Sequence, residues 1–335
     1  MKRDARIDNL RAFLMFLVVL GHLYETVSFP SSEVQYTLIY AFHMPAFVFL
    51  SGVCWKYNGQ EDRRALKNLL YPYVVFQVLW HLFQVWVLKK NPQFQLTSPI
   101  WIQWYFLSMF FWYGAATLLG RLRPWAELTV LALSLVLAVN VGFDKNVGYL
   151  YSASRTLVLF PFFYLGVIYA RRETLRRFVR SVPAKVLGLV CLAAAGVWYG
   201  RRMSAIDHRW LYHSYAYEAL RNPYTWTFRL ISLGLAAGVI LCLMAWFPGR
   251  KLKLVTRIGQ NTLPVYALHG FAVRLLSLKL NWKQYFVQRP MLALPACLGV
   301  ALILLLVLSS PPVAWLTRPL TRWPFGGRKP KQDAV

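Results

Sequence analysis

The sequence predicts an all-α fold: a polytopic transmembrane helical bundle of about ten spans with both termini in the cytosol. Three observations lead to this prediction. Of the 335 residues, 58% are hydrophobic and only 15% are charged, whereas about a quarter are charged in an average soluble domain. The apolar residues form long continuous runs instead of the alternating pattern of a barrel strand. Basic residues, which give a net charge of +26, gather between these runs.

Each long apolar run is a candidate span of about 20 residues. In chain order the runs lie at approximately 10–28, 37–55, 70–88, 100–120, 127–143, 155–171, 185–200, 226–247, 262–278 and 290–310. The fifth, seventh and ninth are short for a bilayer crossing, so the count depends on them. Because no linker divides the chain, we expect one membrane domain over residues 1–317 and a basic cytosolic tail over residues 318–335.

Loop charge predicts the orientation of these spans. With the N-terminus inside, the inner segments carry 23 lysine and arginine residues and the outer segments carry 10. This bias predicts that both termini are cytosolic. No small-residue cleavage site follows the first apolar run, so we expect a retained first span and not a signal peptide.

Neither nucleic-acid binding nor a metal or disulfide site is expected. A net charge of +26 would suggest nucleic acid in a soluble protein, but here no basic patch falls on a soluble domain, and the lipid bilayer is the expected partner. The four cysteines lie in or at the end of apolar runs: Cys54, Cys191, Cys242 and Cys297. Because no CxxC or Cys/His spacing occurs, neither a metal site nor a disulfide framework is predicted.

The first run, RIDNLRAFLMFLVVLGHLYE at residues 6–25, carries an unusual set of charged side chains. On a helix, Arg11 and His22 fall within ~20° of one face, and Asp8 lies within ~40° of it. His22 is then ~16 Å along the axis from Arg11. An ionisable side chain at that depth is costly, which favours a functional His22. The alternative is a histidine that is bonded to a neighbouring helix.

A second histidine is expected at similar depth on the next, antiparallel span. His43 lies in the run AFHMPAFVFLSGVCW, ~9 Å below its outer end, so one histidine could act as base while the other orients it or binds substrate. Alternatively, His43 satisfies backbone groups that Pro45 frees. Ser51 and Gly52 are expected to permit close helix packing more than to provide a nucleophile.

Candidate binding residues lie at both ends of the predicted bundle. On the inner side, Arg64 and Lys67 are three residues apart and share a helical face at the level of Arg11; they are either ordinary inner-loop charge or a clamp for an anionic cofactor. Near the spans, Arg155, Tyr266 and His269 are candidates for substrate binding, although each alone is more often structural.

The largest outer segment spans residues 200–224 and combines aromatic rings with polar groups. It contains Asp207, His208, Trp210, Tyr212, His213, Tyr215, Tyr217 and Glu218. Such a mixture suits contact with a sugar, and it also suits the aromatic belt of a membrane interface.

Six segments, spread in order over most of the chain, carry a resemblance to a known family. They are RIDNLRAFLMFLVVLGH (Arg6–His22), FHMPAFVFLSG (Phe42–Gly52), RRALKNLLYPY (Arg63–Tyr73), WYFLSMF (Trp104–Phe110), FPFFYLG (Phe160–Gly166) and GQNTLPVYALHG (Gly259–Gly270). Together they resemble the acyltransferase 3 family of integral membrane acyltransferases. The second and fifth segments are most similar to the branch of fucose 4-O-acetylases and related sugar O-acetyltransferases.

The resemblance implies ten core helices, a cytosolic acyl-CoA donor, usually acetyl-CoA, and an acceptor hydroxyl on an exported or cell-surface glycan or glycolipid. It implies that His22 is catalytic. It also maps Arg11 and the basic pair Arg64 and Lys67 onto family positions. The family pair is two arginines, so Lys67 is a departure that keeps charge but lacks the bidentate geometry of arginine. We expect no appended extracytoplasmic domain of the kind that longer members carry.

Residues and resemblance together predict an O-acetyltransferase of a bacterial-type inner (plasma) membrane. His22 is the expected general base, because acyl transfer to an alcohol needs a group to take the hydroxyl proton. The main alternative is a polytopic transporter or exporter of a glycan or small anion, although no matching halves with interrupted helices are visible. A structural subunit of a glycan-synthesis complex is a third reading, in which the histidines would be replaceable.

Overall fold

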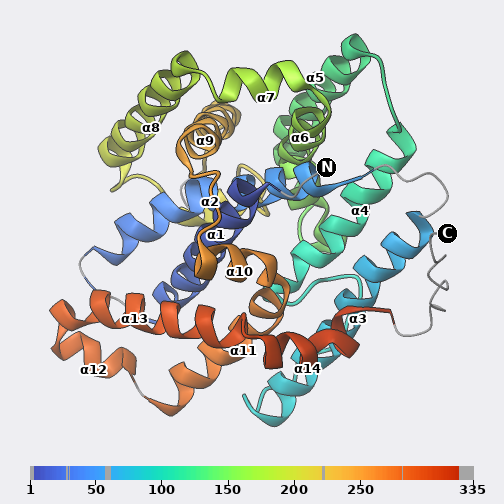
Figure 1. The fold of residues 1–335 in the computed structure, drawn as a ribbon. Coiled ribbons are helices and arrows are strands. Elements are labelled where there is room, and N and C mark those ends of the chain that lie inside the picture. Colours follow the sequence, from blue (N-terminus) through green and yellow to red (C-terminus); the bar gives the residue numbers. More distant parts are fainter. Residues whose placement is uncertain are drawn as a thin grey trace.

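The computed structural model describes residues 4–27, 29, 31–56, 62–220, 223–280 and 282–323. These residues form a bundle of helices in which no strand occurs (Figure 1). The helices are α1 (Ala5–Tyr24), α2 (Ser32–Cys54), α3 (Asp62–Trp86), α4 (Trp104–Leu119), α5 (Pro124–Asn140), α6 (Ala153–Arg171), α7 (Glu173–Val179), α8 (Val182–Arg202), α9 (Trp226–Trp246), α10 (Lys253–Gln260), α11 (Thr262–Lys279), α12 (Trp282–Gln288), α13 (Pro290–Leu308) and α14 (Pro311–Thr321). Two short 3-10 turns, η2 (Trp101–Gln103) and η5 (His208–Tyr212), matter below.

The all-helical class is confirmed, and each predicted apolar run coincides with a helix. Among the described residues, 7 helices are long and apolar enough to cross a membrane: α1, α2, α5, α6, α8, α9 and α13. The pair α11 and α12, which is bent by 65°, would make up to 8. The third and fourth runs correspond to α3, which does not pass the same test, and to α4, which has only 16 residues. The count of ten and the cytosolic termini therefore stay predictions.

Helix α1 lies in the middle of the bundle and packs against α2, α10, α11 and α13 (Figure 1). Its N-terminal turns are fixed by polar contacts to the segment that joins α9 to α10. Asn9 Nδ2 donates to the carbonyls of Pro248 and Arg250 at 2.9 and 3.0 Å. Gln260 Nε2 donates to Asp8 Oδ2 at 3.1 Å. The buried Asp8 therefore helps to anchor α10 against α1, at the far end of the helix from His22.

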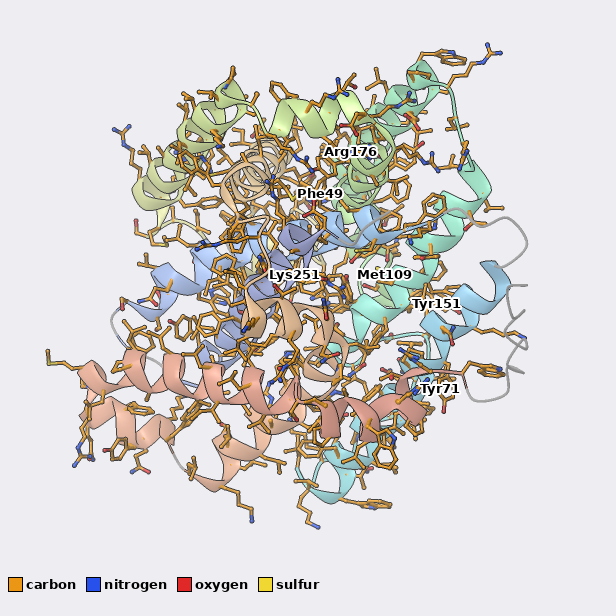
Figure 2. All side chains as sticks on the ribbon, viewed as in Figure 1. Phe49, Tyr71, Met109, Tyr151, Arg176 and Lys251 are labelled. Carbon is orange, nitrogen blue, oxygen red and sulfur yellow. The ribbon has the colours of Figure 1, made fainter. Side chains whose placement is uncertain are left out.

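Helices α2 and α6 cross at two glycines, as expected for Gly52. A Cβ atom at Gly52 would lie 1.9 Å from the carbonyl oxygen of Phe163, and one at Gly166 would lie 2.1 Å from the carbonyl oxygen of Phe49. The two backbones therefore touch, as small residues permit in membrane bundles. Side chains fill the remaining space between the helices, and Phe49 is labelled among them in Figure 2.

Replacing Gly52 with alanine should push α2 and α6 apart, because the obstructing atom belongs to a backbone that cannot rotate away. Overpacking of this kind costs about 1–3 kcal/mol or more, so we expect Tm in detergent to fall by about 5 °C or more. The matched control is Gly234→Ala on α9, where an added Cβ meets nothing within 4 Å. Equal Tm values for the two variants would contradict the glycine crossing.

Candidate active site

The end of α1 brings His22 and Glu25 together. Nδ1 of His22 lies 3.0 Å from Oε1 of Glu25, and the two side chains are 13% and 20% exposed. The spacing of three residues puts both on one side of the last helical turn. A carboxylate only accepts hydrogen bonds, so Nδ1 carries the proton of this bond, and Nε2 is the nitrogen that is left to accept a proton. An imidazole fixed in this tautomer has the state that a general base needs.

Two tyrosines from α2 hold the Glu25 carboxylate in place. The hydroxyls of Tyr36 and Tyr40 donate to Glu25 Oε1 at 3.2 and 2.9 Å. The Tyr36 hydroxyl also lies 2.6 Å from that of Tyr212. Burial opposes ionisation, but the electrostatic interaction with His22 and the hydrogen bonds from His22 and Tyr40 outweigh it and lower the pKa of Glu25. The carboxylate is therefore ionised when it meets His22.

Aromatic rings enclose the His22 imidazole. The Trp101 ring meets it edge-on at 4.8 Å between centroids, and the His269 ring lies at 5.2 Å. Trp101 has a positive φ of 46°, a conformation that costs a bulky residue free energy and is found preferentially at functional sites. The Arg274 guanidinium lies over the Trp101 ring, 4.6 Å from the ring centroid.

The other two predicted histidines are held by backbone carbonyls. His43 Nδ1 lies 2.8 Å from the carbonyl of Ile39, and His269 Nδ1 lies 3.0 and 2.9 Å from those of Val265 and Tyr266. Carbonyls accept, so both rings carry the proton on Nδ1 and present Nε2 as an acceptor. The carbonyl that Pro45 leaves without its helical donor belongs to Ala41, and the observed bond of His43 goes to Ile39 instead. A catalytic role for His43 remains a prediction.

His269 Nε2 is buried and has no hydrogen-bond partner in the described part of the chain. Leaving such a group unpaired costs about 1–3 kcal/mol. Because the His269 ring lies beside that of His22, a ligand that reaches His22 would also meet this nitrogen. The prediction that His269 binds substrate thus gains a physical reason, while it stays a prediction.

Arg155 and Tyr266 have protein partners. The Arg155 Nε donates to the carbonyl of Tyr212 at 3.0 Å, and its guanidinium lies 5.1 Å from the Trp104 ring centroid. The Tyr266 hydroxyl donates to the carbonyl of Ile102. Through these contacts Arg155 positions the segment that carries Tyr212, and Tyr266 fixes the turn next to Trp101. Direct contact of either residue with substrate remains a prediction.

A buried arginine anchors the rest of the outer segment. Arg229 on α9 is 1% exposed and donates to the carbonyls of Ala138 and Tyr215 at 3.1 Å each. Its guanidinium also lies over the ring of Tyr217 at 4.6 Å. Burial keeps the hydroxyl of Tyr212 protonated, because it raises the phenol pKa above its ordinary value. In this segment Tyr212 hydrogen-bonds to Tyr36, which in turn hydrogen-bonds to Glu25.

The opposite end of α1 carries a cavity next to Arg11. Its volume is about 350 Å³, and its lining includes Arg11, Ser51, Cys54, Asn68 and Tyr113. The Arg11 guanidinium also donates to Thr262 Oγ1 at 3.1 Å. Cationic and hydrogen-bonding groups at such a mouth suit a phosphorylated ligand.

The predicted basic pair lies on α3 at the same end of the bundle. The side chain of Arg64 lies outside the described residues. Lys67 is exposed, and its Nζ lies 5.7 Å from the ring centroid of Trp323. The segment after α14 thus approaches the α3 face that carries Asn68 in the cavity lining, since the Trp323 amide also donates to Asn68 Oδ1 at 3.1 Å.

Comparison with known proteins gives this geometry a family. The family model described as an acyltransferase domain (Acyl_transf_3) matches residues 4–310. The chain belongs to the acyltransferase 3 family. The protein is therefore an acyltransferase, which leaves the transporter reading without support.

Two similar relatives of this acyltransferase are both called nodulation protein NolL. That of Mesorhizobium japonicum is 22% identical, over 90% of this chain and 85% of its own length. That of Sinorhizobium fredii is 24% identical, over 82% of this chain and 80% of its own length. No solved structure matches the chain significantly.

Sequence reasoning missed Glu25, Tyr36, Tyr40 and Trp101 as residues of this site. Glu25 had a detectable signal, because it follows His22 by three residues at the end of the same run. The tyrosines and the tryptophan had none, since aromatic residues are common at any membrane interface.

Replacing Glu25 with glutamine should reduce the acylation rate of the acyltransferase by about 100-fold or more, because an amide cannot stabilise the imidazolium that forms during proton transfer. We expect the KM for the acyl donor to change little. Glu25→Asp should keep part of the activity, since it keeps the charge. Initial rates of acyl transfer from labelled donor in reconstituted vesicles test this, and an unchanged kcat in Glu25→Gln would refute the pairing.

Proposed function

We propose that this acyltransferase moves an acetyl group from cytosolic acetyl-CoA to a sugar hydroxyl of an exported or cell-surface glycan, with His22 as the general base. One observation carries the proposal. The His22–Glu25 pair lies at one end of α1, while the cavity beside Arg11 lies toward the other, ~16 Å away along the helix.

The proposed reaction uses His22 twice. Nε2 of His22 removes the proton of the acceptor hydroxyl as its oxygen attacks the thioester carbonyl carbon. When the tetrahedral intermediate collapses, the carbon–sulfur bond breaks and the imidazolium returns the proton to the departing thiolate. Glu25 stabilises the imidazolium between these steps, in the manner of the carboxylate in a hydrolase triad. The products are the sugar ester and CoA thiol.

The donor is proposed to enter at the Arg11 end. Basic residues are concentrated there, and the inner segments carry 23 lysine and arginine residues against 10 in the outer ones, which supports a cytosolic face. Arg11, Arg64 and Lys67 are the proposed contacts for the CoA phosphates. The lining by Ser51 and Asn68 supplies hydrogen-bonding groups for the amide-rich arm of CoA.

An aromatic layer lies between this cavity and the base. The Tyr105 ring is 5.2 Å from that of Tyr266, which is 5.9 Å from that of His269, and His269 adjoins His22. Tyr105 also shares a hydrogen bond with Ser51, which lines the cavity. In the proposed reaction the acetyl end of the donor reaches His22 along these rings.

Replacing His22 with alanine should abolish acetyl transfer while the protein still inserts and folds. The matched control is His81→Ala, because His81 on α3 packs beside Phe94, 5.1 Å between ring centroids, and contacts none of the site residues above. Incorporation of labelled acetyl from acetyl-CoA into membrane glycans measures the outcome. Activity within about tenfold of wild type in His22→Ala would exclude a general base there, since such a group contributes about 100-fold or more.

The donor site predicts protection of one thiol. Cys54 is exposed and lines the Arg11 cavity, so CoA at ten times its Kd should slow alkylation of Cys54 by N-ethylmaleimide about tenfold by mass action. Cys191 on α8 faces α9 at Gly238 and should react at an unchanged rate. Peptide mass spectrometry follows both cysteines, and equal Cys54 rates with and without CoA would argue against this donor site.

A further inference from the structure

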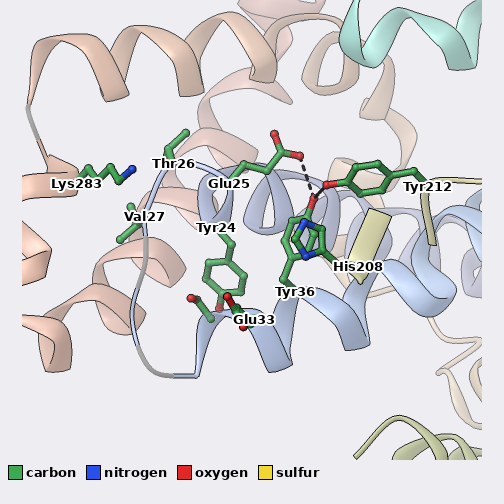
Figure 3. Close-up of a pocket in the computed structure, with 10 residues that line it drawn as sticks. Tyr24, Glu25, Thr26, Val27, Glu33, Tyr36, His208, Tyr212 and Lys283 are labelled. Atoms are coloured by element: carbon green, nitrogen blue, oxygen red, sulfur yellow. Dashed lines mark hydrogen bonds between the residues drawn. The ribbon is translucent and has the colours of Figure 1, made fainter. Parts of the chain in front are cut away.

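A second cavity opens at the Glu25 end of the bundle, beside the catalytic pair. It has a volume of about 290 Å³, and its lining includes Glu25, Glu33, Tyr36, His208, Tyr212 and Lys283. These residues come from the α1–α2 connection, α2, η5 and α12, which are far apart in the sequence. In Figure 3, Lys283 approaches the space from one side and Tyr212 from the other.

Part of this lining is committed to the protein, and part is available. Glu25 and Tyr36 hydrogen-bond to each other, and Tyr36 to Tyr212 (Figure 3). By contrast, the side chains of Glu33, His208 and Lys283 form no hydrogen bond or ion pair with other residues in the ranges that the structure describes. The cavity therefore combines a carboxylate, an imidazole and an ammonium group that are open to a ligand with a rigid wall of tyrosines.

This combination is suited to a sugar. A carboxylate accepts hydrogen bonds from hydroxyls, an ammonium donates to them, and an imidazole can do either. The rings of Tyr36, His208 and Tyr212 pack against one another, with 5.1 Å between the centroids of Tyr36 and His208, and provide apolar surface for the C–H face of a pyranose. A few placed polar groups on an aromatic wall are typical of small-ligand sites.

Size and charge narrow the ligand further. A volume of about 290 Å³ is sufficient for one sugar residue. Two carboxylates, Glu25 and Glu33, face one ammonium, Lys283. An acidic sugar would bring a further negative charge next to the ionised Glu25, and like charges at such distances repel.

We propose that this cavity is the acceptor subsite and that it takes a single neutral sugar residue at the exposed part of a glycan. Glu33, His208 and Lys283 hold hydroxyls of that residue, and the hydroxyl to be acylated extends past Glu25 to Nε2 of His22. The assignment rests on the function proposed above, because it supplies that reaction with its second substrate. It also gives His208 and Tyr212 of the outer segment a place in acceptor contact.

Binding can be measured without catalysis. Saturation-transfer difference NMR on the purified protein detects weak ligands, and the probes are methyl glycosides of neutral hexoses with matched methyl glycosides of hexuronic acids. We expect signals for neutral glycosides in wild type and in His22→Ala, and at least a fivefold loss in Glu33→Gln and in Lys283→Gln. Hexuronides should give no signal. Equal signals for both glycoside classes, no signal for any glycoside, or full binding by Glu33→Gln would each overturn the subsite.

Kinetics in reconstituted vesicles provide the second measurement. With labelled acetyl-CoA and the neutral glycoside that binds best, Glu33→Gln should raise the acceptor KM about tenfold or more, with kcat within about threefold and the KM for acetyl-CoA unchanged. The matched control is Glu173→Gln on α7, whose carboxylate is 54% exposed and pairs with Arg177 at 3.4 Å; its acceptor KM should equal that of wild type. A purely structural effect of Glu33 would instead lower kcat and Tm together, and would overturn the assignment.

The two proposals fail in different ways. If glycosides bind as expected but wild type transfers no acetyl group to them, the acetyl-CoA reaction is wrong and the sugar subsite stands. If wild type acetylates glycosides while the Glu33 and Lys283 variants keep the wild-type acceptor KM, the reaction stands and the subsite is wrong.

Discussion

The hydrogen bond between Glu25 and Nδ1 of His22 decides which nitrogen of the imidazole is free to take a proton. Much of the Glu25 end of the bundle serves this one contact. Tyr36 and Tyr40 fix the carboxylate from α2, Tyr212 fixes Tyr36, and Arg155 fixes the backbone of Tyr212. A carboxylate with several protein donors is held in one orientation, and an oriented carboxylate holds the imidazole in one tautomer.

The same contact requires that α1 itself does not shift. Asn9 ties its first turns to the segment before α10 through two carbonyls, and Gly259 lets the α10 backbone approach Asp8 so closely that a Cβ would lie 1.7 Å from its carbonyl oxygen. The Gly52–Gly166 crossing holds α2, which carries the tyrosines, against α6. Backbone contacts of this kind need no large side chain and resist rotation, so they suit a site in which displacements of about 1 Å matter.

The helices and the importance of His22 could be predicted because they have the strongest signals in the sequence. Long apolar runs predicted the helices, and the unusual depth of His22 singled out the residue that the structure places beside a carboxylate. Close helix packing at Gly52 was also expected, because small residues let helices in a membrane approach each other. What sequence could not supply was which residues meet across the bundle. Glu25, Tyr40, Trp101 and Tyr212 come from four segments, and no periodicity relates them. The number of spans was hard to predict for a different reason, since hydropathy does not show whether a short apolar helix such as α4 crosses the bilayer or is buried within the protein.

The position of His22 between two cavities has a consequence for the energetics of the cell. In the proposed reaction the acyl group leaves the thioester of acetyl-CoA on the cytosolic side. The proton of the acceptor hydroxyl, from the outer side, ends on the CoA thiol. An acylium equivalent thus moves outward for each proton that moves inward, so no net charge crosses the bilayer. Moving one elementary charge through the membrane potential is worth about 2.3 kcal/mol per 100 mV, and this exchange avoids that term. The free energy of acyl transfer by this route would therefore be independent of the membrane potential and would come from the thioester alone.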